Sequence, residues 1–407
     1  MIKIQSLKMI KIQSNIVNKM ETPKRTILHL DLDTFFVSVE RLLNSKLTAK
    51  PVIIGGQSDR AVVSSCSYEA RQFGVHSGMP MKMAYNLCRD AIIIRGDMDL
   101  YTKYSRLVTD VIADQAPVYE KASIDEHYID ITGMDRFFCS YAWSHELRNR
   151  ILKETGLPVS FGLSVNKTVS KIATGEAKPN GEKEVPAPLV QPFLNPLSIR
   201  KIPMVGEKSY QLLRSMAVST IQTLSAIPQP MMESLLGKTG LEIWRRANGI
   251  DASPVVPYSE EKSISKECTF ETDTIDIDMM KQVIIGMVEK LAFKLRKYQK
   301  LTSVVTIKIR YANYDTHSLQ KKICYTSFDH VLMDTALELF KRLYERRMLI
   351  RLIGVKLGGL VNGAQQLDLF DHNEKMINLY MQIDKIKLRY GASAIQRASG
   401  LMTHSPS

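Results

Sequence analysis

The sequence lacks any long uncharged apolar run. None of its 407 residues lies in a stretch that approaches the roughly 18 apolar residues of a membrane span. This absence excludes an integral membrane protein, and we expect no membrane among the binding partners. Cysteine is also scarce, with five residues scattered along the chain and no CxxC pair or other ligand spacing. This scarcity excludes a disulfide scaffold, argues against structural zinc and favours a cytoplasmic location.

Positive charge, in contrast, is abundant. Lys and Arg number 55 against 42 Asp and Glu, which gives a net charge of +13 and a pI near 9.3. Residues 263–360 alone hold 17 Lys or Arg and 11 Asp or Glu. Such a field favours anionic partners, namely nucleic acid, nucleotide or anionic lipid, although a merely soluble basic protein has the same balance. Hydrophobic residues, at 44%, are ordinary for folded domains and argue against disorder.

The pattern along the chain indicates several domains. Residues 1–23 contain a duplicated MIKIQS hexapeptide without the features of a signal peptide, so we expect a loose extension with Met9 and Met20 as alternative starts. Strand-like and helical stretches alternate over residues 25–165, as in an α/β domain. Residues 184–196 hold four prolines and predict a loop. Residues 199–251 predict only helices, residues 252–262 an interdomain linker, and residues 263–362 a second mixed block.

Two acidic pairs interrupt the apolar strands of the first block. Asp31 and Asp33 end one strand-like run, and Asp125 with Glu126 lies between two others. Adjacent strand residues point to opposite faces, so the backbone must turn at this second pair if both carboxylates act together. Oxygen-only donors favour Mg²⁺ or Mn²⁺ over zinc. Taken alone, each pair is more often a helix cap or a solvated turn.

Four motifs together resemble those of the Y-family (lesion-bypass) DNA polymerases, in particular the DNA polymerase IV branch. The similarity covers residues 25–400, and the motifs occur in the order of that family. They are Asp31-Leu32-Asp33-Thr34-Phe35-Phe36, Tyr68-Glu69-Ala70-Arg71, Ser123-Ile124-Asp125-Glu126 and Ala177-Lys178-Pro179-Asn180-Gly181.

The resemblance implies an α/β multi-domain fold arranged as a right-hand polymerase. It would have an α/β palm, small fingers, an all-helical thumb with a helix-hairpin-helix, and an α+β little finger. The expected boundaries are 1–23 for the extension, 24–36 and 96–185 for the palm, 37–95 for the fingers, 186–251 for the thumb, 252–262 for the linker, 263–362 for the little finger and 363–407 for a clamp-binding tail.

The resemblance also implies a metal-dependent active site. Asp31, Asp125 and Glu126 would be the catalytic carboxylates and, with the Leu32 carbonyl, would hold two Mg²⁺, with Mn²⁺ as an alternative. His127 stands where the family commonly has a small residue. It could hydrogen-bond a ligand carboxylate or merely pack, and we favour packing.

Further residues would bind the incoming deoxynucleoside triphosphate. Phe36 matches the steric gate, an aromatic ring that excludes a ribose 2′-hydroxyl, which leaves Phe35 as a core residue. Tyr68 and Arg71 share a helix face and suit phosphate oxygens. The expected nucleotide contacts are Phe36, Ser65, Tyr68, Arg71 and Lys178.

Two segments resemble DNA-holding or partner-binding motifs. Residues 199–208 resemble a helix-hairpin-helix that would contact primer-template DNA through Lys201, Val205, Gly206 and Lys208. Met204 replaces a common glycine there and would crowd a close backbone approach. In the tail, Gln366, Leu367, Leu369 and Phe370 resemble the anchors of a sliding-clamp-binding peptide, although docking on the chain's own C-terminal helix is the alternative.

The resemblance therefore implies a template-directed, low-fidelity DNA polymerase for translesion synthesis, without proofreading, acting as a monomer. One rival is a catalytically silent DNA-binding or clamp-scaffolding protein, against which the retained Asp31, Asp125, Glu126 and Lys178 speak. Another is a nucleotide cyclase with a similar palm, which would need neither the thumb hairpin nor the little finger.

Overall fold

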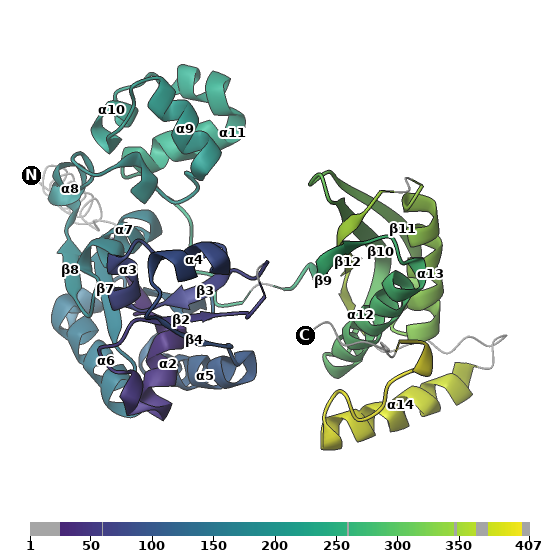
Figure 1. The fold of residues 1–407 in the computed structure, drawn as a ribbon. Helices are drawn as coiled ribbons and strands as arrows, with labels where there is room; N and C mark the ends of the chain where they lie inside the picture. The colour runs from purple at the N-terminus through teal and green to yellow at the C-terminus, as the bar shows by residue number, and fades with distance from the viewer. Residues whose placement is uncertain (1–24, 59, 259, 346–347, 364–372, 401–407) are drawn as a thin grey trace, which may run out of the picture. The chain divides into compact units, whose positions relative to one another are not determined.

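Chain contacts divide this computed structural model into two units (Figure 1). The structure describes residues 25–58, 60–258, 260–345, 348–363 and 373–400. Unit 1 comprises residues Met1–Gln57 and Ala61–Ser259, and unit 2 comprises Ser58–Arg60 and Glu260–Ser407. In the part of the chain so described, no helix is long and apolar enough to cross a membrane.

A five-stranded sheet forms the centre of unit 1. Its order is β5 (Tyr119–Lys121), β6 (Glu126–Asp130), β1 (Ile27–Leu32), β7 (Val159–Ser164) and β8 (Glu182–Val185). The central strand β1 runs antiparallel to both β6 and β7, while β7 and β8 are parallel. The first predicted acidic run therefore lies in the middle of the sheet, where strands on both sides fix its position.

Helices cover both faces of this sheet, and alternate side chains of β1 face different helices. Leu28, Leu30 and Leu32 are buried in a core shared with α5 (Met98–Gln115) and α6 (Ser140–Thr155). His29 and Asp31 take the opposite face, toward α7 (Lys167–Ala177). This alternation follows from the two-residue period of a strand, and it brings the acidic residues of β1 to the α7 side.

Helix α7 packs unusually close to β7 because of a glycine. A side chain at Gly162 would place its Cβ 2.2 Å from the Ser170 carbonyl oxygen and 2.5 Å from the Thr174 amide nitrogen. Neither backbone atom can move without moving the helix. Gly162 thus sets how near α7 comes to the sheet.

A smaller three-stranded sheet lies beside the first in unit 1. Its order is β3 (Val63–Cys66), β2 (Val52–Gly55) and β4 (Ile92–Ile94), and it packs with helices α2 (Phe35–Leu43), α3 (Tyr68–Gln72) and α4 (Met81–Leu87). Phe35 is 3% exposed, as expected for a core residue. A 3-10 helix at Ser45–Leu47 joins α2 to β2.

The rest of unit 1 is helical and corrects one expectation. Residues 184–196 were expected to be a loop because of their four prolines. They instead contain the end of β8, a 3-10 helix at Ala187–Leu189 and α8 (Val190–Leu194). Pro188 lies in the first turn, where a proline needs no amide donor, so it starts a helix rather than preventing one. The elements that follow are η4 (Ile199–Lys201), α9 (Glu207–Ser215), α10 (Ile221–Ser225) and α11 (Gln229–Ala247).

The first half of the expected linker is attached to the α/β part of unit 1. Asp251 accepts hydrogen bonds from the Thr168 amide at 3.1 Å and the Thr168 hydroxyl at 2.8 Å. Glu120 accepts from the Val256 amide at 2.7 Å, and Val255 is buried against Ile27. These contacts attach residues 251–256 to the α/β part of unit 1, within the expected linker and just before it.

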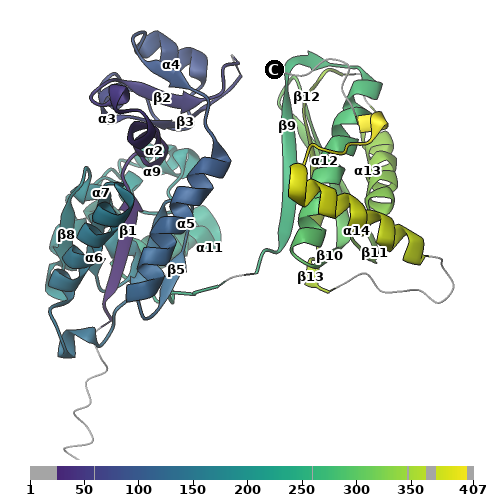
Figure 2. The same cartoon turned by 90° about the horizontal axis from the view of Figure 1, so that it is seen from below.

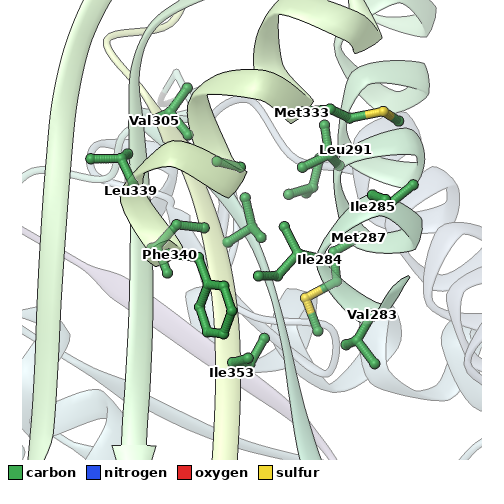
Figure 3. Close-up of a cluster of buried hydrophobic side chains, with 14 of the residues drawn as sticks. Val283, Ile284, Ile285, Met287, Leu291, Val305, Met333, Leu339, Phe340 and Ile353 are labelled. Carbon is green, nitrogen blue, oxygen red and sulfur yellow. The ribbon is translucent and has the colours of Figure 1, made fainter. Parts of the chain in front are cut away.

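Unit 2 is an antiparallel sheet backed by two helices. The strand order is β11 (Thr316–Thr326), β10 (Lys300–Tyr311), β12 (Ile350–Gly358) and β9 (Ser263–Thr274), with β13 (Val361–Asn362) paired to β10. Helices α12 (Ile277–Lys297) and α13 (Asp329–Leu343) pack on one face. Figure 3 shows this core, in which Ile284, Leu291, Leu339 and Phe340 meet Val305 and Ile353 of the sheet.

The two outer strands and the last helix complete unit 2. The sequence did not predict β9 or β11, because their mostly exposed residues lack a clear apolar alternation. Helix α14 (Asn373–Tyr390) belongs to unit 2 (Figure 2), where a partly buried ionic contact joins it to α12. The Arg296 guanidinium on α12 binds both carboxylate oxygens of Asp384, at 2.7 and 2.9 Å, and also Asp329 of α13 at 2.5 Å.

Candidate active site

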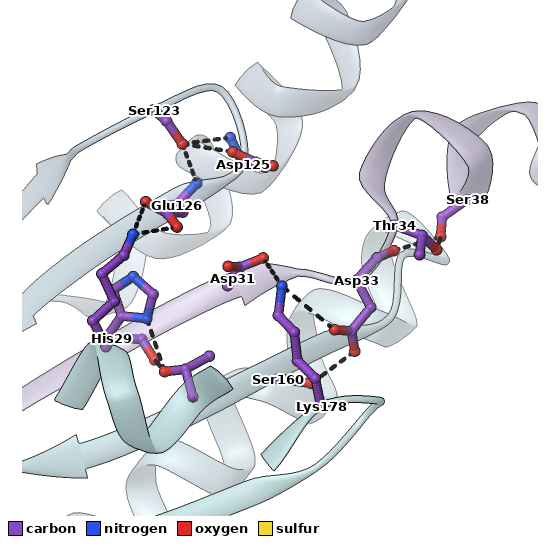
Figure 4. A network of polar contacts seen from close by, with 12 residues as sticks. His29, Asp31, Asp33, Thr34, Ser38, Ser123, Asp125, Glu126, Ser160 and Lys178 are labelled. Atoms are coloured by element: carbon purple, nitrogen blue, oxygen red, sulfur yellow. Dashed lines mark hydrogen bonds and ion pairs between the residues drawn. The ribbon is translucent and has the colours of Figure 1, made fainter. Parts of the chain in front are cut away.

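Two strand ends bring the acidic pairs together. Asp31 on β1 and Glu126 on β6 are direct cross-strand partners. Asp125 precedes β6 in a tight turn, so the backbone turns where the sequence required it to. The Ser123 hydroxyl donates to Asp125 Oδ1 at 2.5 Å and accepts from the Glu126 amide at 3.1 Å, which fixes this turn (Figure 4).

Two lysines from the α7 side neutralise these carboxylates. Lys171 on α7 places its Nζ 2.5 and 2.6 Å from the two oxygens of Glu126. Lys178, just after α7, places its Nζ 2.5 Å from Asp31 Oδ1 (Figure 4). Lys178 was expected beside the nucleotide, whereas Lys171 was not predicted as a site residue.

The electrostatics of Asp31 reflect a crowded, buried site. Burial raises its pKa to about 7, and the charges of Glu126 and Asp125 also raise it, while the Lys178 ammonium opposes them. Ionising Asp31 is therefore costly unless a further positive charge approaches.

The donor set fits a hard divalent cation. Asp31, Asp125, Glu126 and the Leu32 carbonyl offer only oxygen atoms, which suits Mg²⁺ or Mn²⁺. Throughout the described ranges, no three acidic, His or Cys side chains already surround one point. The lysine ammonium groups lie against Asp31 and Glu126 instead. A cation would take over the neutralising role of those ammonium groups.

Asp33, the second carboxylate of the first motif, has a different environment. It is 2% exposed and accepts from the Ser160 hydroxyl at 2.7 Å and the Asn180 amide at 2.6 Å, both at Oδ2. At Oδ1 it accepts from the Tyr68 hydroxyl at 3.2 Å. Burial and the nearby Asp33 charge raise the pKa of Tyr68, which therefore stays a hydrogen-bond donor. Asp33 thus ties three separate segments together.

Most of the expected nucleotide contacts line one pocket of about 140 Å³ next to the acidic site. The expected residues on its wall are Asp31, Leu32, Phe36, Ser65, Arg71, Asp125 and Lys178. Tyr68 is not on that wall but touches it through Arg71, whose guanidinium lies 5.1 Å from its ring centroid. The pocket also includes Thr34 and Phe35 of the first motif, which were not expected to contact the nucleotide, and Ser64 and Ser77, which the sequence did not single out.

The expected gate ring has a rigid support. Phe36 stacks on Tyr101 with a centroid distance of 4.3 Å and an interplanar angle of 12°. Tyr101 is fully buried, and its hydroxyl donates to Glu40 Oε1 at 2.7 Å. Glu40 follows the first motif, whereas Tyr101 lies in an ordinary amphipathic helix, so no local pattern marked Tyr101 as part of the site.

Two histidines near the site are buried and neutral. His127 is 1% exposed on the α5 face, and its Nε2 lies 3.0 Å from the Thr109 hydroxyl rather than near a ligand carboxylate. Burial lowers its pKa to about 3, so the packing interpretation of His127 is confirmed. His29, whose pKa burial also lowers, pairs through Nδ1 with the Thr174 hydroxyl at 2.8 Å.

The expected DNA-binding hairpin contains backbone strain. Met204 has φ +79°, the left-handed region that favours glycine. The Val205 amide donates to Ile202 at 3.2 Å and the Gly206 amide to Met204 at 3.1 Å, within the turn itself. Lys201 is paired with Glu176 at 2.8 Å, while Lys208 is exposed. These residues remain predicted DNA contacts.

The sheet of unit 2 has one face that no helix of its described part covers. Side chains of β10 alternate, so Val305, Ile307 and Ile309 enter the core while Lys308 and Arg310 face outward. By register, Lys322 and Lys356 share this open face. Lys321, in contrast, lies on the helix side and pairs with Glu338 of α13 at 2.6 Å. Four basic residues of this block therefore lie on the open face: Lys308, Arg310, Lys322 and Lys356.

The expected clamp-binding anchors Gln366, Leu367, Leu369 and Phe370 lie outside the described residues. The same holds for the N-terminal duplication.

Known proteins match the chain over most of its length. Residues 30–175 match the impB/mucB/samB family model, and residues 261–369 match the model of that family's C-terminal domain. DNA polymerase IV of Dehalococcoides mccartyi strain CBDB1 is 40% identical over 376 residues, which covers 91% of this chain and 96% of the relative.

Solved structures give the same result for the fold. The Y-family DNA polymerase chimera Dbh-Dpo4(243-245)-Dbh superposes with a TM-score of 0.72 at 26% identity, and an insertion ternary complex of Dbh DNA polymerase with a TM-score of 0.61 at 26% identity. In both cases the match covers 83% of this chain and 100% of the other.

Proposed function

Because the chain belongs to the impB/mucB/samB family and is a Y-family DNA polymerase of the DNA polymerase IV branch, we propose that the acidic site adds deoxynucleotides to a primer 3′-hydroxyl by two-metal phosphoryl transfer. The observation that carries this proposal is the convergence of Asp31 and Glu126 as cross-strand partners beside Asp125, next to the pocket lined by Arg71 and Lys178. Carboxylates on one side and phosphate-binding cations on the other are what a metal–triphosphate complex requires.

Each group at the site then has a role. Asp31, Asp125, Glu126 and the Leu32 carbonyl would hold two divalent cations, with Mg²⁺ the proposed ion. Bound there, the cations would supply activation of the primer 3′-hydroxyl and neutralisation of the leaving pyrophosphate. Lys171 and Lys178 balance the carboxylate charge before loading.

The triphosphate would be held by the basic and hydroxyl groups of the pocket. Arg71 offers a planar fork for phosphate oxygens, Lys178 a point charge and Ser65 a hydroxyl donor. Tyr68, whose hydroxyl donates to Asp33, would contribute through its ring contact with the Arg71 guanidinium. Phe36, supported by Tyr101, would lie under the sugar and exclude a 2′-hydroxyl. A rigid ring excludes more strictly than a mobile one, since it cannot swing away from the added oxygen.

Primer-template DNA would be held by sequence-independent phosphate contacts. The proposed contributors are the hairpin residues Lys201, Val205, Gly206 and Lys208 and the open face of unit 2 with Lys308, Arg310, Lys322 and Lys356. Such contacts weaken steeply with salt. Gln366, Leu367, Leu369 and Phe370 would bind a sliding clamp.

The family of the chain supports translesion synthesis, and we propose that it proceeds without proofreading. A primer-extension assay with Mg²⁺ on undamaged and lesion-bearing templates tests it. Extension on both templates, with mismatched primer ends retained, is the expected result. DNA binding without any extension would instead favour the catalytically silent scaffold.

The clamp assignment has its own test. Leu369→Ala/Phe370→Ala should lose the stimulation of extension by a loaded clamp and keep clamp-independent extension, because the active site lies in unit 1. Each buried anchor contributes about 1.5–3 kcal/mol. Asp371→Ala, in the same segment, is the control and should retain stimulation. Equal loss with and without clamp would mean that the anchors stabilise the fold.

A further inference from the structure

Two buried groups of opposite charge grip Asn180 from either side. Asn180 follows Lys178 by two residues and has φ +48°. Its amide donates to Asp33 Oδ2 at 2.6 Å. Arg148 Nη2 donates to its carbonyl oxygen at 2.8 Å and to its Oδ1 at 2.6 Å. The residue is therefore fixed through its amide, its carbonyl and its side chain at once.

The Arg148 end of this grip is itself immobile. Arg148 is on α6 and is 9% exposed. Its Nε donates to the Val159 carbonyl of β7 at 2.8 Å, and its Nη1 to Glu182 Oε1 of β8 at 2.7 Å. A guanidinium whose three nitrogens all donate to fixed acceptors is held in one orientation. Arg148 thus holds the loop of residues 178–181, which connects α7 to β8.

The Asp33 end connects the same loop to the nucleotide pocket. Asp33 also accepts from Tyr68, whose ring contacts the Arg71 guanidinium, and from Ser160 on β7. Lys178 leaves the loop two residues before the gripped position and reaches Asp31. A lysine side chain has four rotatable bonds, so the position of its Cα decides where its ammonium can go.

Stability alone does not explain these buried charges. Well-packed apolar side chains of similar volume often stabilise a fold as well as a buried ion pair does. What apolar residues cannot reproduce is the directional hold on three polar atoms of one loop residue. A displacement of about 1 Å at a reacting site can reduce a rate by about a hundredfold, so such a hold has functional value.

We propose that Arg148, acting with Asp33 through Asn180, is a positioning residue that aims the Lys178 ammonium at the triphosphate of the incoming nucleotide. The proposal rests on the proposed function of Lys178 in nucleotide binding. It extends that function to a residue on the far side of the loop, which does not line the pocket.

The first test compares two arginines of the same helix. Arg148→Met removes the grip, and Arg150→Met is the control, since Arg150 is surface-exposed and pairs only with acidic side chains of the surface, Glu154 at 2.6 Å and Asp114 at 3.8 Å. The readout is the Kd of a deoxynucleoside triphosphate for enzyme bound to a dideoxy-terminated primer-template. Arg148→Met should raise this Kd by about tenfold with primer-template affinity within about twofold, and Arg150→Met should change neither. An unaltered nucleotide Kd in folded Arg148→Met would overturn the proposal.

A double-mutant cycle asks whether Arg148 acts through Lys178. In a Lys178→Met background, Arg148→Met should weaken nucleotide binding no further, because the group it positions is gone. Full additivity of the two effects would contradict the proposal. Asn180→Gly keeps the left-handed backbone and removes only the Oδ1 acceptor, so it should raise the Kd by a smaller factor, about threefold. This variant carries the test if Arg148→Met does not fold.

Hydrogen exchange separates the grip from the nucleotide role. The Asn180 amide should exchange faster in Arg148→Met than in the wild type or in Arg150→Met, as measured by mass spectrometry of the peptide that contains it. Unchanged exchange would disprove the grip. If Lys178→Met leaves nucleotide affinity intact, the proposed function of Lys178 is wrong, and the further proposal falls with it even if the exchange result holds.

Discussion

The ring of Phe36 lies nearly parallel to that of Tyr101, with centroids 4.3 Å apart. Tyr101 is buried and anchored at its hydroxyl by Glu40 on α2, the helix that also carries Phe36. Tyr101 therefore contacts α2 twice, through the ring of Phe36 and through the carboxylate of Glu40. Such a ring keeps its place when a sugar packs against it.

Removing the gate ring should relax sugar selection. Phe36→Ala should raise the ratio of ribonucleotide to deoxynucleotide incorporation by at least about tenfold, which is about 1.4 kcal/mol, because space opens at the 2′ position. Tyr101→Leu, which loses a stacking contact worth about 0.5–1.5 kcal/mol, should give a smaller change in the same direction. Single-nucleotide insertion kinetics measure both. Phe35→Ala should instead cost about 3–5 kcal/mol of stability, because that ring is buried in the core.

The acidic residues should be needed for chemistry and not for DNA binding. Asp31→Ala, Asp125→Ala and Glu126→Ala should each reduce primer extension by at least about a thousandfold, or about 4 kcal/mol of transition-state stabilisation. Primer-template affinity should stay within about threefold, since the cations are proposed to act on the reacting groups. Asp110→Asn, an exposed carboxylate on α5, is the control. Near-normal extension by Asp125→Ala would refute the metal assignment.

Cation binding should depend on pH through Asp31, whose pKa burial raises to about 7. Below that pH a proton must leave before a cation binds, so the Kd for Mn²⁺ should fall by about tenfold from pH 6 to pH 8. In the metal-free protein the native state holds an extra proton up to about pH 7, so the Asp31 contribution to stability declines as pH rises toward 7. Calorimetric titration measures the cation effect. Asp31→Asn should bind Mn²⁺ more weakly and without this dependence.

Strain at Met204 should be removable. Its φ of +79° costs a residue with a Cβ about 1–2 kcal/mol, so Met204→Gly should raise the thermal midpoint of unit 1. Met231 is similarly exposed but lies at the start of α11, so the same substitution there is a control with the opposite expected sign. Met231→Gly should lower the midpoint, because glycine in a helix costs about 1 kcal/mol. Differential scanning calorimetry distinguishes the two signs.

The open face of unit 2 should carry part of the salt dependence of DNA binding. Lys356→Ala should reduce the slope of log K against log salt by about 0.9, the value for one neutralised phosphate. Lys321→Ala, on the helix side of the same sheet, should leave the slope unchanged. Fluorescence anisotropy at several salt concentrations gives both slopes. Equal effects of the two substitutions would mean that overall charge, and not the face, determines binding.

Local pattern was sufficient to predict the elements that carry the acidic site. Asp31 ends an apolar run, and the neighbouring pair at Asp125 and Glu126 requires a turn, so both positions follow from strand periodicity. Phe35 as a core residue and His127 as a packed one were also correct. The environment of each of these residues depends mainly on its neighbours in the sequence, so it could be predicted from the sequence.

Other features depend on partners distant in the chain. The strands β9 and β11 have polar residues on both faces and exist because β10 and β12 pair with them. Lys171, Tyr101 and Arg148 look like ordinary helix residues until the sheet brings their partners near. The 3-10 helix at Ala187–Leu189 and the helix α8 were missed because four prolines were taken to exclude a helix, although Pro188 lies in the first turn of the 3-10 helix.

Gly162 sets the distance between β7 and α7. The clearance between β7 and α7 leaves no room for one methyl group, and Lys171 is carried by that helix and Lys178 by the residues just after it. The distance of their ammonium groups from Asp31 and Glu126 therefore depends on how closely α7 packs on β7 at Gly162. A single added carbon at residue 162 would push α7 away from β7 and move Lys171 and Lys178 with it. The charge balance of the site therefore depends on the packing between α7 and β7.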